Sequence, residues 1–311
     1  MGAFIMEGQQ EENPVKLAFT QLLEQAQNQS KDGAPVDVVA KELLHYDILR
    51  AVSDSDLARD VTFQGGSALR LFYDGQRYSE DLDFVIGAGD NREFVVDGMI
   101  ELLKQQVIDR YGLEVEIKEP SNHEFNGVDV RTWQCKIAIP GFARKQMIKV
   151  EFCNVPAHDV SAKLIKPRYA FLNDTHSAIM LRVESEREIM ADKLVAIANR
   201  RYLKGRDLWD LKYLAERNTA PDYDLVSQKL RDYDSQDFAQ KLETSIERLR
   251  SPDAAKTFMA EMEKFLSPAA LKALKLQVPP GIDYVEFALE KMLTMQQQLV
   301  TRLQPTDLAL R

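Results

Sequence analysis

Apolar and polar residues follow three successive patterns along this chain, and each pattern predicts a different kind of structure. Residues 15–58 repeat apolar positions at helical spacing with an interruption at 30–35, which predicts two helices. Short apolar or alternating runs then predict strands at 61–64, 82–86, 113–117, 130–139 and 146–154. Helical spacing predicts helices at 67–73 and 93–111, and from about Glu184 to the end it predicts helices alone. The pattern indicates an α+β fold, with a mixed sheet, flanking helices and a helical C-terminal domain.

The length sets the expected domain organisation. The chain has 311 residues, of which 45% are apolar and 29% are charged. At roughly 150 residues per domain, this length favours about two domains with real cores, and the composition excludes intrinsic disorder. We expect an N-terminal helical segment at 1–58 that packs on the core, an α/β core at 59–184 and a helical domain at 185–311.

The sequence also bears on the cellular compartment. No apolar stretch approaches the ~18 residues that span a bilayer. The first fourteen residues carry three glutamates and lack the basic-then-apolar layout of a signal peptide. Cys135 and Cys153 are the two cysteines, and they form neither a CxxC motif nor a metal-binding pattern with histidines. We therefore expect a cytoplasmic protein without a membrane partner.

The net charge of −9 argues against a generally basic nucleic-acid coat protein, but the charge is unevenly distributed. Residues 1–60 have a net charge of −6, whereas residues 130–173 have a net charge of +6. A second basic run comprises Arg200, Arg201, Lys204 and Arg206. Such clusters bind phosphates or another polyanion, or they are solvated faces that share a sign.

Two short motifs, joined by one predicted helix, carry the candidate chemistry. Gly65, Gly66 and Ser67 separate a strand from a helix, where backbone N–H groups and a hydroxyl can bind a phosphate, and Ser67 is the expected N-cap. Asp81 and Asp83 are two apart on a strand, so both carboxylates point to the same side and repel unless a cation lies between them. Mg²⁺ is commonly held by one or two carboxylates plus substrate phosphates. Either motif alone suits a plain turn or an exposed strand face, but the two together are much more specific.

These motifs resemble the signature of the nucleotidyltransferase superfamily related to DNA polymerase β, and most of all its AbiEii/AbiGii-type toxin group. The resembling residues are Gly-Gly-Ser-Ala-Leu-Arg at 65–70, Arg77, Ser-Glu-Asp-Leu-Asp-Phe at 79–84 and a second stretch at 186–214. The resemblance implies a nucleotidyltransferase core in which Gly66 and Ser67 hold the nucleotide phosphates and the paired aspartates bind the metal. It does not cover the first 55 residues or the last 95.

The superfamily commonly places a third carboxylate on a later strand, and Glu151 is the best candidate for it. Ile148, Val150 and Phe152 form the apolar face of the predicted strand at 146–154, which leaves Glu151 on the other face. An ordinary exposed glutamate on a strand fits this pattern equally well.

Lys193 shares a predicted helix face with apolar residues one turn before and one turn after it. An inward ammonium needs an anion, such as a nucleotide phosphate or a carboxylate, although a lysine stem lying on apolar surface fits as well. The resemblance implies an essential lysine here, followed by an aspartate. Asp207, expected in the first turn of the next helix, is preferred for the catalytic position, with Asp210 as an orienting or capping residue.

Other residues carry less weight. Arg70 either reaches the nucleotide phosphates or braces the first core helix against the acidic strand. The four histidines are scattered and form no metal pattern, Ser67 has no triad partners in its sequence context, and the Gly-Gly-Ser turn lacks the Lys-Ser/Thr of a P-loop.

Together, the residues and the resemblance predict a Mg²⁺-dependent nucleotidyltransferase that moves NMP from an NTP to an acceptor hydroxyl. Asp81, Asp83 and Glu151 would hold one or two Mg²⁺ ions, and Lys193 would neutralise the triphosphate. The resemblance implies a toxin of a bacterial toxin-antitoxin or phage-defence system, with a cognate antitoxin and with tRNA as a plausible acceptor. Two alternatives stay open: an acceptor that is a small molecule or a protein, and a nucleotide- or RNA-binding protein without turnover.

Overall fold

The computed structural model describes residues 14–30, 33–87, 97–125, 128–173, 177–235 and 237–302. The helices of the N-terminal half are α1 (Pro14–Ser30), α2 (Val36–Asp54), α3 (Gly65–Phe72) and α4 (Asp97–Tyr111). The strands are β1 (Val61–Gln64), β2 (Asp81–Ile86), β3 (Val115–Phe125), β4 (Val128–Ile137), β5 (Gln146–Cys153), β6 (Val160–Leu164) and β7 (Met180–Glu184). The later helices are α6 (Glu186–Asn199), α7 (Gly205–Glu216), α8 (Tyr223–Asp232), α9 (Phe238–Arg250), α10 (Ala254–Met262), α11 (Pro268–Lys275) and α12 (Ile282–Arg302).

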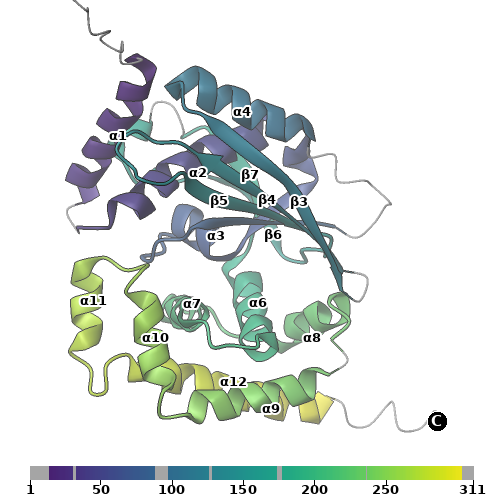
Figure 1. Ribbon diagram of the computed structural model, residues 1–311. Coiled ribbons are helices and arrows are strands. Elements are labelled where there is room, and N and C mark those ends of the chain that lie inside the picture. The colour runs from purple at the N-terminus through teal and green to yellow at the C-terminus, as the bar shows by residue number, and fades with distance from the viewer. Residues whose placement is uncertain are drawn as a thin grey trace, which may run out of the picture.

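The sheet separates the N-terminal helices from the C-terminal ones. In Figure 1, α1, α2 and α4 lie at the top and α6 to α12 at the bottom, with the strands and α3 between them. The strand order is β3-β4-β5-β2-β1-β7-β6, and the sheet is mixed because β2 pairs parallel with β5 and antiparallel with β1. This architecture confirms the predicted α+β fold with a mixed sheet and a helical C-terminal region.

The register of the central strands decides which polar side chains meet. Asp83 lies opposite Gln64 of β1 on one side and opposite Glu151 of β5 on the other. Asp81 lies opposite Lys149, so both aspartates and Glu151 belong to adjacent positions at the same part of the sheet. The alternate residues of β5, among them Ile148 and Phe152, are fully buried, as their spacing predicts.

One hydrophobic cluster extends through the described chain. It begins at Phe19 of α1, includes Phe63, Phe84 and Phe152 of the sheet, and continues to Met295 of α12. Phe84 and Phe152 stack with their ring centroids 5.1 Å apart, which fixes β2 against β5. Because the cluster is continuous, the N-terminal helices, the sheet and the C-terminal helices share a core, and the division at residues 58 and 184 stays a prediction.

Several element predictions need correction. Ser67 is not the N-cap: α3 begins at Gly65 with Gln64 at the capping position, and the Ser67 hydroxyl instead donates to the carbonyl oxygen of Asp81. Strands β6 and β7 were not predicted, and β3 extends well beyond the predicted residue 117. Both missed strands have five residues, and β6 lies at the edge of the sheet with little burial, so its sequence shows no apolar face. The N-terminal part of the helix predicted at 93–111 lies outside the described residues.

Within the described residues, no helix combines the length and the apolar character that a bilayer crossing requires. Cys135 and Cys153 are both buried and free.

Candidate active site

Three carboxylates occupy neighbouring positions of the sheet where β2 passes between β1 and β5. Asp81 and Asp83 project from the same face of β2, and the parallel register sets Glu151 directly beside Asp83. Thr132 on the next strand donates from Oγ1 to Glu151 Oε2 at 3.1 Å, which orients that carboxylate. The sequence placed Asp81 and Asp83 on one face, and the tertiary structure adds Glu151 to them.

The electrostatics of Asp83 show how crowded this negative charge is. Burial raises the pKa of Asp83 to about 7, and the neighbouring carboxylates of Glu151 and Asp81 add to the increase. Lys193 and Arg206 act in the opposite direction, so cations of the C-terminal helices lie within electrostatic range of the sheet carboxylates. Carboxylate oxygens with excess negative charge are ligands of the kind that a hard divalent cation such as Mg²⁺ prefers.

The Gly-Gly-Ser turn packs tightly against this acidic strand. Gly65 has a φ of +77°, and a Cβ at this position would come within 3.0 Å of Asp83 Oδ2. Both facts require glycine, because other residues rarely adopt this backbone conformation and would crowd the carboxylate. No side chain caps α3, and uncapped N–H groups in the first turn of a helix favour an anion.

Arg77 covers the turn and connects it to the C-terminal helices. A Cβ on Gly66 would lie only 2.0 Å from Arg77 Nη2, so the guanidinium group rests directly on Gly66. Its Nε and Nη2 both donate to Asp210 of α7, each at 2.6 Å, in a bidentate pair. Arg77 is buried, and Nη1 donates to the carbonyl oxygen of Tyr78. In the sequence, the single signal of a role for Arg77 is its position within the run that carries the resemblance.

Lys193 lies between both candidate aspartates of α7. Its Nζ is 3.0 Å from Asp207 Oδ1 and 2.8 Å from Asp210 Oδ2. The inward position that its apolar neighbours predict is correct, since the side chain is 11% exposed and the charge has carboxylate partners. Asp207 lies in the first turn of α7, as predicted, and its Oδ2 is also 2.6 Å from Arg200 Nε.

The three charges stabilise one another. Burial acts to lower the pKa of Lys193, but Asp210 and Asp207 outweigh it and raise the pKa above its usual range. Burial likewise favours the neutral form of Asp207, but Lys193 and Arg200 lower its pKa to about 2. The pKa of Asp210 falls too, because Arg77 and Lys193 overcome the effect of burial. All three groups are therefore charged at neutral pH.

Arg70 braces α3 against α2. Its Nε and Nη2 donate to the two carboxylate oxygens of Glu42 at 2.6 and 3.2 Å, and Nη1 donates to the carbonyl oxygens of Gly75 and Gln76. Its guanidinium group also lies 4.1 Å from the centre of the Tyr78 ring. The partner helix is thus α2 and not the acidic strand.

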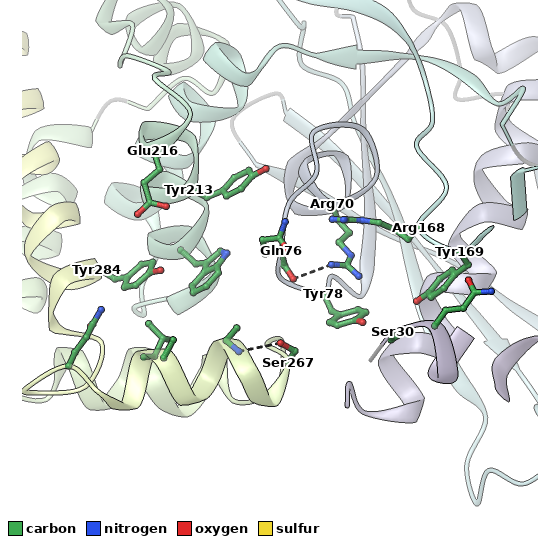
Figure 2. Close-up of a pocket in the computed structure, with 16 residues that line it drawn as sticks. Ser30, Arg70, Gln76, Tyr78, Arg168, Tyr169, Tyr213, Glu216, Ser267 and Tyr284 are labelled. Atoms are coloured by element: carbon green, nitrogen blue, oxygen red, sulfur yellow. Dashed lines mark hydrogen bonds between the residues drawn. The ribbon is translucent and has the colours of Figure 1, made fainter. Parts of the chain in front are cut away.

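None of the three candidate carboxylates lines a cavity of about 640 Å³, whose lining residues Figure 2 shows. It is lined from α1, α3, α7, α11 and α12, with Tyr78, Tyr213 and Tyr284 among its walls. Of the predicted site residues, only Arg70 lines it. The volume of this cavity therefore does not locate the candidate active site, which is defined by the positions of the charged side chains.

A second carboxylate cluster, formed by Glu184, Glu188 and Asp192, is already neutralised in part. Their ligand oxygens lie within 4.8 Å of one another, but Lys229 Nζ occupies the centre at 2.6 Å from Glu188 and 3.2 Å from the other two. Lys229 is fully buried, so this cluster is an internal ion-pair network that joins β7, α6 and α8.

In each basic segment, half of the bases form ion pairs with acids among the described residues. Of the bases at 130–173, four pair with described acids: Arg131 with Asp129, Lys136 with Glu116, Lys145 with Glu114 and Lys166 with Asp74. In the shorter run, Arg200 pairs with Asp207 and Arg206 with Glu261, whereas Arg201 and Lys204 pair with no acid among the described residues.

Comparison with one solved structure supports this fold. MenT4, a nucleotidyltransferase toxin from Mycobacterium tuberculosis H37Rv, superposes with a TM-score of 0.51 at 19% identity, covering 91% of this chain and 89% of its own. JHP933 from Helicobacter pylori gives a TM-score of 0.47 at 17% identity, covering 88% and 100% of the two chains. No curated protein has a matching sequence.

The family comparison extends over most of the chain. Residues 47–291 match the model of the family described as nucleotidyl transferase AbiEii toxin, type IV toxin-antitoxin system. This span includes both glycine and aspartate motifs, Glu151 and the Lys193–Asp207–Asp210 cluster. The chain belongs to the AbiEii nucleotidyltransferase toxin family.

Proposed function

We propose that this toxin nucleotidyltransferase is Mg²⁺-dependent and transfers NMP from an NTP to a hydroxyl of an RNA acceptor, with tRNA as the plausible target. The observation that carries the proposal is that a set of carboxylates and a lysine lie within electrostatic range of each other. Asp81, Asp83 and Glu151 concentrate negative charge on the sheet, and Lys193 of α6 acts electrostatically on Asp83. A nucleoside triphosphate with its metal ions needs both kinds of group.

The carboxylates and the turn have separate tasks. Asp81, Asp83 and Glu151 would hold one or two Mg²⁺ ions, which when bound align the attacking and leaving oxygens of an in-line displacement. Gly66 and Ser67 would receive the β- and γ-phosphates, because the uncapped N–H groups of α3 favour an anion. The buried Ser67 hydroxyl donates to the carbonyl oxygen of Asp81 and so holds this turn against β2.

Lys193 would neutralise charge on the triphosphate, and the two aspartates of α7 would hold its ammonium group in position. Both contact it at 2.8–3.0 Å, which explains why a buried lysine stays charged. Asp207 has an unshared contact with the exposed Arg200 and remains the preferred catalytic aspartate. Asp210 has Arg77 as its second partner and fits the orienting role.

As a toxin, the chain would act in the cytoplasm, where NTPs and tRNA are available, and in phage defence, and a cognate antitoxin would restrain it. Its two buried, unpaired cysteines are compatible with a reducing compartment.

The test is transfer of label from each α-labelled NTP to total tRNA in the presence of Mg²⁺. We expect the wild type to transfer label to RNA only when Mg²⁺ is present. Asp81→Asn and Lys193→Ala should transfer no label. Asp74→Asn is the matched control, since Asp74 is a half-exposed aspartate whose partner is Lys166 at the surface. Label on protein or on a small molecule would replace the RNA acceptor, and nucleotide binding without any transfer would contradict enzymatic turnover.

A further inference from the structure

The loop between α6 and α7 exposes an aromatic ring beside unpaired cations. Tyr202 is 67% exposed, although tyrosine rings normally pack against other apolar groups. The guanidinium group of Arg201 lies 5.5 Å from the centre of this ring. Neither Arg201 nor Lys204 forms an ion pair with an acid among the described residues.

A fourth residue joins this surface from a distant part of the sequence. Arg248 of α9 lines the same small hollow as Tyr202 and Lys204, and its Nη1 donates to the carbonyl oxygen of Arg200 at 2.9 Å. Arg248 also forms no ion pair within the described chain. The tertiary structure therefore gathers three unpaired cations, Arg201, Lys204 and Arg248, around one exposed ring.

This surface is directly connected to the candidate active site. Arg200 lies at the start of the loop and pairs with Asp207, which in turn pairs with Lys193. An acceptor strand that lies on the loop would thus have one end close to the group that handles the triphosphate.

We propose that Tyr202, with Arg201, Lys204 and Arg248, binds the single-stranded end of the nucleic-acid acceptor. The ring offers a stacking face that every base can use, and the three cations bind the phosphates on either side. This inference rests on the proposed function, because it assigns the acceptor of that reaction to a surface.

A binding experiment without NTP tests the inference separately from catalysis. The probe is a short fluorescein-labelled single-stranded RNA, with the same RNA annealed to its complement for comparison. We expect Tyr202→Ala to weaken binding of the single strand about 5- to 100-fold, because one base loses its stacking partner. Tyr202→Phe should bind within about twofold of the wild type, since the ring is retained, and the duplex should show little dependence on Tyr202.

The cations make a different prediction. Lys204→Ala should reduce the slope of log K against log salt by about 0.7, which corresponds to one lost phosphate contact on a single strand. Lys272→Ala is the matched control, because Lys272 is an exposed lysine of α11 without an ion-pair partner in the described chain and does not line the hollow. It should leave the slope unchanged.

Two results would overturn the inference: wild-type affinity for single-stranded RNA in Tyr202→Ala, or an equal loss in Tyr202→Phe. Failure of the proposed function would look different. In that case the Tyr202-dependent binding would be present, but the wild type would transfer no label from any NTP to RNA.

Discussion

Gly65 and Gly66 are adjacent, yet the structure requires glycine at each for a different reason. Gly65 has a positive φ and faces Asp83, whereas Gly66 is confined by the guanidinium group of Arg77. Arg77 cannot easily move away, because two hydrogen bonds hold it to Asp210. The tight turn thus keeps the backbone of α3 close to both the acidic strand and α7.

Gly66→Ala should damage the site through this contact. The added methyl group must displace the buried guanidinium group of Arg77, which two hydrogen bonds hold to Asp210. Overpacking of this kind typically costs about 1–3 kcal/mol. We expect a lower melting temperature and a raised KM for NTP, measured by thermal denaturation and by the label-transfer assay. Gly87→Ala is the control, since nothing lies within 4 Å of a Cβ there. Equal behaviour of the two variants would contradict this account of Gly66.

At the scale of elements, β7 and α6 act as one unit that sets the position of Lys193. β7 pairs with β1, one strand in from the edge of the sheet, and continues into Ser185. The Ser185 hydroxyl accepts from Glu188 N–H as the N-cap of α6. Glu188 also accepts the backbone N–H groups of His158 and Asp159. Lys229 of α8 forms ion pairs with Glu184, Glu188 and Asp192 next to this junction.

Lys229→Met should strongly destabilise the protein. It leaves three carboxylates in a buried setting without their cation, and breaking a buried ion pair commonly costs about 3–5 kcal/mol. We expect the free energy of unfolding in urea to fall by this order. Lys241→Met is the control, because Lys241 pairs with Asp237 on the surface, where such a pair contributes about 0–1 kcal/mol. A change in Lys229→Met as small as in the control would exclude an important role for the cluster.

At the scale of the whole molecule, buried ion pairs connect segments that are far apart in sequence. Arg77 and Asp210 are 133 positions apart, and their pair links the loop before β2 to α7. Lys193 shares Asp210 with Arg77, so the Gly-Gly-Ser turn, α6 and α7 form one network. A nucleotide bound at this turn would meet side chains of α6 and α7 that ion pairs already hold in position.

A double-mutant cycle on this pair should show strong coupling. Arg77→Met removes one of the two cations that contact Asp210, and Asp210→Asn leaves the buried Arg77 without its carboxylate. The double variant should therefore lose less stability than the two single losses combined. We expect an interaction free energy in urea denaturation of about 1.5–3 kcal/mol, as for hydrogen bonds to charged groups. The exposed pair Lys275–Glu263 provides the reference cycle, with an expected coupling below about 1 kcal/mol. Simple additivity at Arg77 and Asp210 would rule out the proposed link.

The amino-acid sequence by itself determined the local features of this protein. Alternation predicted the central strands β2 and β5, helical spacing predicted α2 and α6, and the motif residues identified Asp81, Asp83 and Lys193 as candidates. These are properties of short stretches, where side-chain direction follows from the period of one strand or one helix. Strand β6 was missed because it lies at the edge of the sheet and buries little of its surface, so its sequence shows no apolar face.

Only the tertiary structure decided which of these residues meet. The parallel register of β2 and β5 brings Glu151 to Asp83, and the contact of α6 with α7 gives Lys193 both Asp207 and Asp210. Arg77 on Gly66 and Arg248 beside Tyr202 also depend on packing between distant segments. Spacing along the chain cannot reveal such pairs, because strand register and helix packing are set by burial in the common core and not by the local order of residues.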